Sequence, residues 1–352
     1  MIRRMAQGFS SRITYEVVTL TYPFTSVRYT SFRNKVLDHF LPVTTTGRSL
    51  TTTLSSFEPD IVYSDSPFYA GQFQVASFLR GKRRPLILHL RGDWWREYHD
   101  WLLSAAWRKR LFSIQNLALQ STGIMLSSKI TPICKWLERI VKRYTHNKRT
   151  EVVYQGVDPN QFYSQDGFNF QRPAVAIIQN HTVYGKVAGL LEFHRVVERL
   201  PKVHFYIAEG EEVDQSFLPL IKQRFRELPN VHFVSGINTA EAVRKMLTTS
   251  DCYVLASGLD CCPTTVLEAS LMRKPVIVSR IGGVPEIVLE NQTGWTVRNG
   301  DVEGWVEKIG LAVTDYRLNR RLGRKGREWV AETFGWDKIA RQVENMLISE
   351  TV

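Results

Sequence analysis

Two carboxylates and two threonines surround the start of a predicted helix in the second half of the chain. The segment Ser257–Ser270 reads Ser-Gly-Leu-Asp-Cys-Cys-Pro-Thr-Thr-Val-Leu-Glu-Ala-Ser. Its proline is typical of a first helical turn, so we expect Asp260 in the preceding loop and Glu268 about one turn inside the helix. The backbone amides around Thr264 and Thr265 would then form an anion site that could hold a phosphate.

Two interpretations of these carboxylates are open. One carboxylate near a pyrophosphate and one deeper in the site suit a sugar nucleotide, because its hydroxyl groups need hydrogen-bond acceptors on both sides of the pyrophosphate. In the structural alternative, Asp260 is a turn or cap residue and Glu268 lies on a solvated helix face.

Length and composition limit the classes of protein that such a site can belong to. The 352 residues suggest two domains, and 43% hydrophobic with 23% charged residues is an ordinary globular composition. No stretch approaches about 18 consecutive apolar residues, so we expect no membrane-spanning helix. Four cysteines, two of them adjacent, form neither a disulfide framework nor a spaced metal motif and fit a reducing compartment.

Short apolar runs alternate with longer amphipathic segments along the whole chain. Such alternation predicts parallel sheets covered on both faces by helices, here in two doubly wound lobes. The polar stretch Gln155–Gly167, rich in glycine and proline, predicts the join. The expected strands are Tyr15–Thr19, Asp60–Tyr63, Leu86–Leu90, Gly123–Leu126, Val175–Ile178, Val203–Ala208, Val231–Val234, Cys252–Ala256 and Val276–Ser279, and the expected helices are Val187–Leu200, Ala240–Thr249, Pro263–Arg273 and Trp305–Val313.

Several motifs follow one another in a fixed order. They are the linker Tyr154–Asp158, the pair Asp260 and Glu268 eight residues apart, the stretches Lys274–Val288 and Thr293–Val297, and Phe334–Trp336. Together they resemble the retaining glycosyltransferases of the GT-B fold, in particular the large family 4, whose acidic E-x7-E motif the carboxylate pair matches. The resemblance covers roughly residues 120–345 well and the first 120 weakly.

The resemblance implies a GT-B architecture of two Rossmann-like α/β lobes that face each other across a cleft. It implies an N-terminal acceptor-side domain at 1–165, a nucleotide-sugar-binding domain at 166–333 and a C-terminal helix at 334–352 that returns to the first domain. The implied reaction is retaining hexosyl transfer from a UDP- or GDP-linked sugar. The family generally works without a catalytic metal, and the chain has no Asp-x-Asp motif, so we expect neither a metal nor a cofactor besides the donor.

The resemblance also assigns roles residue by residue. Asp260 stands where the family usually has a glutamate next to the donor sugar, and Glu268 would accept the ribose hydroxyls. Lys186 matches the lysine that steadies the pyrophosphate; alone it would be interpreted as a solvated lysine at a helix start. The family's partner arginine is replaced by Asn180, which weakens the cationic clamp, and the following His181 is a candidate substitute.

Five further positions complete the predicted site. His89 ends the Leu86–Leu90 strand where the family commonly has a histidine near the donor sugar and the acceptor, with a structural hydrogen-bonding role as the alternative. Arg91 and Asp93 are weaker candidates beside it. Backbone groups of Gly236 and Ile237 are the expected contacts of the base. We assign no protein nucleophile.

The front lobe lacks an expected element. A doubly wound half begins with a strand that lies in the middle of its sheet, but only a dozen helix-like residues precede the Tyr15–Thr19 strand. A start that lies too late in the sequence is the favoured explanation, and an unusual closure of the sheet is the alternative.

Positive charge is concentrated in the first half of the chain. Residues 1–150 hold 23 Lys and Arg against 9 Asp and Glu, a net charge of +14, which exceeds the net charge of +12 of the whole chain. Cationic segments with aromatic stripes at Trp94–Phe112 and Ile133–Tyr144 suit an anionic membrane surface, unless these stripes pack into the core. We therefore expect a lipid-linked or cell-surface glycan acceptor and a cytoplasmic protein that can associate with the inner face of the cell membrane.

Two other functions fit part of the sequence. A soluble acceptor such as a sugar phosphate or a polysaccharide would use the positive charge only for attraction. A basic nucleic-acid-binding protein would explain the charge alone, but the chain contains no reader motif, and we expect no nucleic acid as a partner.

Overall fold

The computed structural model divides the chain into two compact units. One comprises Met1–Tyr154 with Ile339–Val352, and the other comprises Gln155–Lys338. The structure describes residues 8–11, 13, 20–21, 43–44, 60–67, 70–71, 73–74, 84–93, 117–118, 120–145, 149–181, 183–209 and 217–351. The predicted strand Tyr15–Thr19 and the aromatic segment Trp94–Phe112 lie outside these residues.

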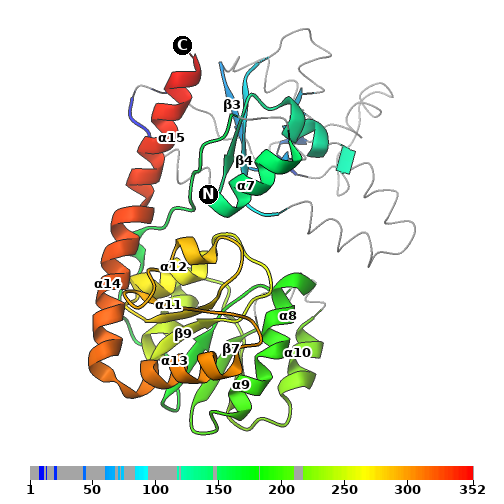
Figure 1. Ribbon diagram of the computed structural model, residues 1–352. Helices are drawn as coiled ribbons and strands as arrows, with labels where there is room; N and C mark the ends of the chain where they lie inside the picture. The colour runs from blue at the N-terminus through cyan, green and yellow to red at the C-terminus, as the bar shows by residue number, and fades with distance from the viewer. Residues whose placement is uncertain are drawn as a thin grey trace. The chain divides into compact units, whose positions relative to one another are not determined.

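A six-stranded parallel sheet forms the centre of the second unit (Figure 1). Three of its strands, Ala174–Ile177, Cys252–Leu255 and Val276–Ser279, are short and buried at every position, as expected for parallel strands covered on both faces. In spatial order the strands are β11 (Gly294–Val297), β10 (Val276–Ser279), β9 (Cys252–Leu255), β6 (Ala174–Ile177), β7 (His204–Ala208) and β8 (Val231–Val234).

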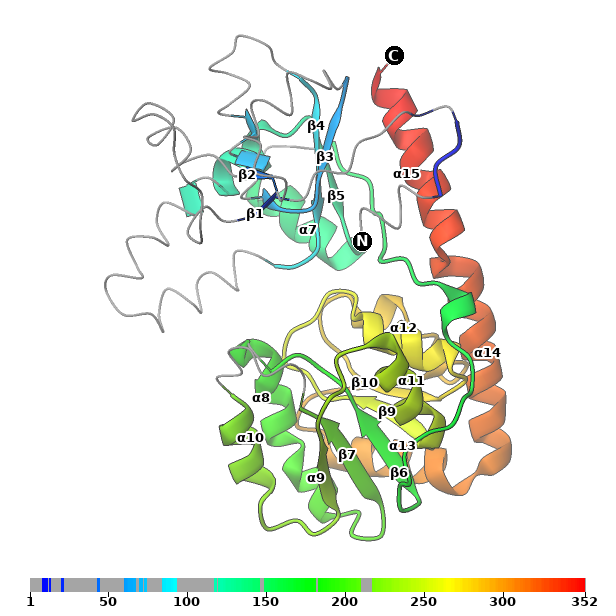
Figure 2. The ribbon, with the colours of Figure 1, turned by 180° about the vertical axis from the view of Figure 1, so that it is seen from behind.

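Helices cover both faces of this sheet (Figure 2). Side-chain caps fix several of their starts; Thr239 caps one helix and Asp301 another through hydrogen bonds to backbone amides. The helices are α8 (Tyr184–Glu192), α9 (His194–Glu198), α10 (Leu218–Phe225), α11 (Ala240–Thr249), α12 (Thr264–Leu271), α13 (Val302–Thr314) and α14 (Tyr316–Phe334), with short 3-10 turns at Pro159–Gln161 and Val284–Glu286.

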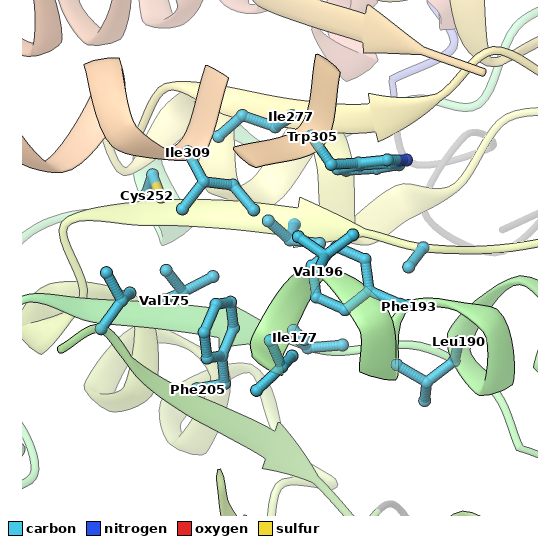
Figure 3. Close-up of a cluster of buried hydrophobic side chains, with 14 of the residues drawn as sticks. Val175, Ile177, Leu190, Phe193, Val196, Phe205, Cys252, Ile277, Trp305 and Ile309 are labelled. Atoms are coloured by element: carbon cyan, nitrogen blue, oxygen red, sulfur yellow. The ribbon is translucent and has the colours of Figure 1, made fainter. Parts of the chain in front are cut away.

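The core of the second unit lies between the sheet and helices α8, α9 and α13 (Figure 3). Phe193 stands at its centre, where its ring meets Phe205 of β7 and Trp305 of α13 edge-on at centroid distances of 5.9 and 5.2 Å. Such aromatic pairs add to the burial free energy that fixes the helices on the sheet. The loops at the strand ends are therefore carried by a rigid framework.

The first unit contains a three-stranded parallel sheet in the order β3 (Val62–Ser64), β4 (Leu86–Leu90) and β5 (Lys129–Pro132). Helix α7 (Lys135–Tyr144) follows β5, and two short strands, β1 (Leu20–Thr21) and β2 (Val43–Thr44), pair antiparallel. The last helix, α15 (Trp336–Thr351), is tied to this unit by Gln342, whose amide donates to the Val152 carbonyl at 2.9 Å.

One predicted strand is wrong. Residues 120–126 are helical, and the strand begins later, at Lys129. Gly123 and Ile124 are buried, whereas Met125 and Leu126 are 68% and 58% exposed, which is the one-sided burial of a helix. A short apolar run does not by itself distinguish a strand from a buried helix segment.

No helix among the described residues has the length and apolar character needed to cross a membrane.

Candidate active site

The strand order of the six-stranded sheet reverses between its two central strands. The chain runs outward from β6 to β8 on one side and from β9 to β11 on the other. In open parallel sheets, ligands bind at the carboxyl ends of the strands where this reversal occurs, because the loops there lead to opposite faces. The loops that leave β6 and β9 are therefore the candidate site.

A charged pair joins the loop that leaves β9 to the start of helix α8, into which the β6 loop leads. Lys186 lies in the first turn of α8, Asp260 lies between β9 and α12, and their Nζ and Oδ2 atoms are 3.7 Å apart. Both side chains are mostly buried, at 23% and 16% exposure. Burial raises the pKa of the Asp260 carboxyl, although Lys186 and the Cys261 backbone N–H oppose the shift.

Close backbone contact holds the two loops together. The Gly258 N–H donates to the Lys186 carbonyl at 3.3 Å, and a Cβ at Gly258 would collide with the Gly185 carbonyl oxygen. On its other side, the Ser257 N–H donates to the Ser279 hydroxyl at 3.0 Å. Only glycine fits at position 258, so the spacing of Lys186 and Asp260 is built into the backbone.

Helix α12 begins at the same place with no side-chain cap. Its uncapped start leaves an anion-binding end of the helix dipole beside Asp260 in the sequence. Thr264 and Thr265 are half-buried in its first turn, and Glu268 is half-buried one turn further along. The backbone amides predicted to bind phosphate and the Glu268 carboxylate predicted to accept the ribose hydroxyls thus belong to one helix.

Tyr253 of β9 links this helix to β6. Its hydroxyl donates to the Ile178 carbonyl at 2.8 Å and lies 2.7 Å from the Thr265 hydroxyl. Burial raises the pKa of Tyr253, and the charges of Asp260 and Glu268 raise it further. Both predicted carboxylates therefore act electrostatically on one buried phenol.

The loop after β6 carries no charged side chain, and several of its polar atoms lack hydrogen-bond partners among the described residues. Asn180 is exposed, whereas His181 is 3% exposed. Neither ring nitrogen of His181 has a hydrogen-bond partner among the described residues, and the same holds for both amide atoms of the half-buried Gln179. Burial lowers the pKa of His181 to about 4, with Glu209 opposing the shift.

The predicted contacts of the nucleotide base follow the end of β8. Gly236 is exposed, with a φ of +75° and open space where a Cβ would be, and Ile237 is 5% exposed. Beside them, the Glu209 carboxylate accepts hydrogen bonds from Lys222 and Ser235, which hold its pKa below the usual range.

In the first unit, His89 lies in β4 and is fully buried. Its Nδ1 lies 3.1 Å from the Thr131 hydroxyl, and its Nε2 has no partner among the described residues. Burial lowers the pKa of His89 to about 3, with a smaller contribution from Arg91. Arg91 is 4.0 Å from Asp65, and Asp93 is 7% exposed. His89 is therefore a neutral imidazole with one nitrogen available.

Family models match both halves of the chain. Residues 182–329 match the model described as glycosyl transferases group 1, and residues 1–161 match the model described as glycosyltransferase family 4. The chain belongs to the family 4-like group 1 glycosyltransferases. The predicted family is confirmed.

Curated relatives of this glycosyltransferase carry varied names. N-acetyl-alpha-D-glucosaminyl L-malate synthase of Bacillus anthracis is 26% identical over 212 residues, which are 57% of this chain and 54% of that protein. Alpha-maltose-1-phosphate synthase of Mycolicibacterium smegmatis is 26% identical over 216 residues, 55% of each chain. The glycosyltransferase spans a little over half the length of these relatives.

Solved structures confirm the GT-B fold. Sucrose-phosphate synthase from Thermosynechococcus elongatus superposes with a TM-score of 0.73 and 15% identity over 94% of this chain and 82% of that one. Anabaena HepE in complex with UDP-glucose gives 0.68 and 18% over 85% and 81%. At these identities the likeness establishes the fold.

Sequence reasoning missed three residues of the site. Gln179 and Glu209 follow β6 and β7, and Tyr253 lies in β9; the position of Gln179 and Glu209 directly after an apolar run was the available signal. Lys186 and Asp260, which were predicted, lie together. Among the described residues, no group of three or more His, Cys, Asp and Glu side chains is placed to hold a metal ion. The arrangement can bind an anion beside Lys186 and polar groups beside the neutral loop.

Proposed function

We propose that this glycosyltransferase moves a hexosyl unit from a nucleotide sugar to an acceptor with retention at the anomeric carbon. The observation that carries the proposal is the Lys186–Asp260 pair at the carboxyl ends of the central strands. A UDP-glucose complex of the structural neighbour HepE supports a nucleotide-sugar donor.

The diphosphate of the donor is bound between Lys186 and the uncapped start of α12. Charge builds up on the leaving phosphate as the glycosidic bond breaks, and an ammonium group already positioned there stabilises that charge. Asp260 keeps Lys186 in place through their 3.7 Å contact and offers its carboxylate to a sugar hydroxyl. Glu268, one turn into α12, accepts the ribose hydroxyls.

Retention is achieved by attack of the acceptor from the face on which the phosphate leaves. We assign no protein nucleophile, so the phosphate itself is the group that takes the acceptor's proton. The donor base contacts backbone groups near Gly236, where the positive φ and the open space admit a flat ring.

The donor assignment is tested by a thermal-shift screen of UDP- and GDP-sugars, followed by kinetics of Glu268→Ala. Loss of a charged acceptor is expected to weaken donor binding by about 10- to 100-fold, equivalent to about 1.5–3 kcal/mol. Glu307→Ala is the control, because Glu307 is 61% exposed on α13 and forms an ion pair with its neighbour Lys308. Unchanged donor kinetics in Glu268→Ala would refute the site.

The acceptor is a lipid-linked or cell-surface glycan, and the +14 balance of residues 1–150 holds the first unit against an anionic membrane. Helix α7 contributes Lys135, Arg139 and Arg143, all exposed. Its apolar stripe packs inward at Leu137 and Val141, so α7 contacts lipid headgroups through its cations.

Vesicle co-sedimentation tests the membrane. Binding should require anionic lipid, weaken as salt rises and weaken further when Lys135, Arg139 and Arg143 are replaced by glutamine. Protein that stays in the supernatant with acidic vesicles at low salt would favour the second candidate, a soluble acceptor. That candidate draws support from the relatives named for malate and for maltose 1-phosphate.

A further inference from the structure

Unsatisfied polar groups are concentrated in one loop of the molecule. Eight buried side-chain nitrogen and oxygen atoms lack a hydrogen-bond partner among the described residues, and four of them belong to Gln179 and His181. Each such group costs folding free energy unless something binds it. In the described part of the chain, every side-chain polar atom of Gln179 and His181 is unsatisfied, which is rare in folded proteins.

The position of this loop points to a ligand. It leaves β6, one of the two central strands between which the strand order reverses. Its start is fixed, because the Ile178 carbonyl accepts from the Tyr253 hydroxyl at 2.8 Å. The unsatisfied atoms therefore lie at the ligand-binding end of the sheet on a loop with a defined position.

The chemistry of the two side chains selects the kind of ligand. Burial lowers the pKa of His181 to about 4, so near neutral pH its ring has one N–H donor and one acceptor nitrogen. Gln179 likewise has a donor NH2 group and an acceptor oxygen. Phosphate oxygens near neutral pH only accept, and they would leave both protein acceptors unpaired. A hydroxyl group donates and accepts, and it satisfies such a pair.

We infer that Gln179 and His181 form a neutral subsite that recognises hydroxyl groups of the donor and not its diphosphate. This inference rests on the proposed nucleotide-sugar donor. It divides the site into two parts: Lys186 and the start of α12 bind the charged groups, and the β6 loop selects among sugars by their hydroxyls. His181 then does not take over the role of the family's arginine, whose position is occupied by Asn180.

The test uses Gln179→Met and His181→Phe, which keep the side-chain volume and remove the polar atoms. UDP-glucose, GDP-mannose and the two free nucleoside diphosphates are titrated into the full-length wild type and each variant by calorimetry. The variants should bind the nucleotide sugar that the wild type binds about 10- to 100-fold more weakly. Gln155→Met, which changes a buried glutamine at the start of the second unit, should bind it unchanged.

The probes distinguish the source of the hydroxyl. If the subsite holds the hexose, the variants keep wild-type affinity for the free diphosphate. If it holds the ribose, affinities for the diphosphate and the nucleotide sugar fall in equal proportion, and the 2′-deoxy nucleotide binds wild type and variants equally. Inhibition by inorganic pyrophosphate stays unchanged in both cases.

Stability and pH provide readouts that a structural role would not give. The ligand-free variants should melt at or above the wild-type temperature, because they no longer bury unsatisfied polar atoms. A melting temperature several degrees lower would overturn the inference. The affinity difference between His181→Phe and wild type should be constant from pH 8 to pH 6; a difference that grows on acidification would indicate a cationic His181 on phosphate. Glu209 faces His181 and pairs with Lys222 and Ser235, and it is present in both proteins.

The remaining outcomes separate the inference from the proposed function. If the wild type binds a nucleotide sugar and both variants bind it equally well, the subsite is refuted and the donor stands. If the wild type binds neither the nucleotide sugars nor the diphosphates, the proposed donor fails, and the subsite fails with it.

Discussion

The two loops at the centre of the second unit's sheet differ in how their polar groups are satisfied. In the β9 loop (Ala256–Pro263), Asp260 pairs with Lys186 and accepts the Cys261 N–H, while the Ser257 backbone is bound on both sides by Ser279 and Asn299. In the β6 loop (Ile178–His181), no side-chain polar atom of Gln179 or His181 has a hydrogen-bond partner within the described part of the chain. One loop is charged and complete, and the other is neutral and incomplete.

This difference indicates which part of a ligand each loop is built to meet. A complete charged loop can hold a lysine in place before a ligand arrives, so little reorganisation is needed when charge develops beside it. An incomplete neutral loop gains its hydrogen bonds only from the ligand, so it discriminates strongly between ligands that have the matching hydroxyls and those that lack them. The first loop suits catalysis and the second suits selection.

Lys186→Ala should give the largest effect, because it removes the cation from the charged side. We expect kcat/KM to fall by about 100- to 1000-fold, in the range that loss of one group stabilising a leaving or developing charge produces. Steady-state kinetics with the donor found in the screen measures it. Lys308→Ala, at a surface ion pair on α13, is the matched control. A loss below fivefold would remove Lys186 from the reaction.

Gly258→Ala should break the contact between the loops. A Cβ there meets the Gly185 carbonyl oxygen, and the strain should lower the free energy of unfolding by about 1–3 kcal/mol and reduce activity by moving Lys186. Gly310→Ala in α13 is the contrast, because nothing lies within 4 Å of its Cβ position. That change should stabilise the protein by about 0.5–1 kcal/mol through helix propensity. Chemical denaturation measures both, and equal effects would contradict the close approach.

Much of the second unit's framework was predictable from the sequence. The runs Val231–Val234 and Val276–Ser279 and the helix Ala240–Thr249 match the structure, because apolar stretches there are bounded by polar and turn-forming residues. The strand Gly294–Val297 was not predicted, since it is short and begins with glycine. The predicted helix Val187–Leu200 divides at Phe193, where the ring enters the core.

The site was predictable only where residue type carries the information. A lysine and an aspartate beside strand ends indicate a charged site. The family resemblance assigns Lys186 and Asp260 to one donor site, and in the structure they lie 3.7 Å apart. Gln179 carries no charge that could indicate such chemistry. What distinguishes it is that its buried amide atoms have no hydrogen-bond partner among the described residues, which is a property of the packing around it. For the same reason the neutral state of His181 follows from burial and not from sequence.

His181→Phe should also sharpen the comparison through the pH dependence of stability. The folded pKa of His181, about 4, is below its ordinary value of 6.5, so the unfolded chain binds more protons between these values. Wild-type stability contributed by this group is present above pH 6.5 and is lost as pH falls towards 4. The variant should lack up to about 1.4 kcal/mol per pH unit of that slope. Urea denaturation at pH 7, 6 and 5 measures it, with the non-titrating Gln179→Met as control; equal slopes for wild type and His181→Phe would contradict a buried neutral imidazole.

Asp260→Asn should have a small effect on stability, and it should be a gain. Burial raises the pKa of the Asp260 carboxyl above its usual 3.8 even though Lys186 and the Cys261 N–H hold it down, so the ionised form is unfavourable in the folded state. The contribution of this group to stability is complete below pH 3.8 and is lost as pH rises through the folded pKa.

At pH 7, asparagine removes the buried charge, still accepts the Cys261 N–H, and leaves a Lys186 side chain that is 23% exposed to water. We expect Tm at pH 7 to rise by about 2–4 °C, equivalent to about 1 kcal/mol in a unit of this size, while activity falls sharply. Calorimetry at pH 7 and pH 4 checks the cause, because the gain should shrink at pH 4, where wild-type Asp260 is more protonated. A lower Tm at pH 7 would mean that attraction to Lys186 outweighs the cost of burial, and the charged loop would then be a source of stability and not a site maintained at its expense.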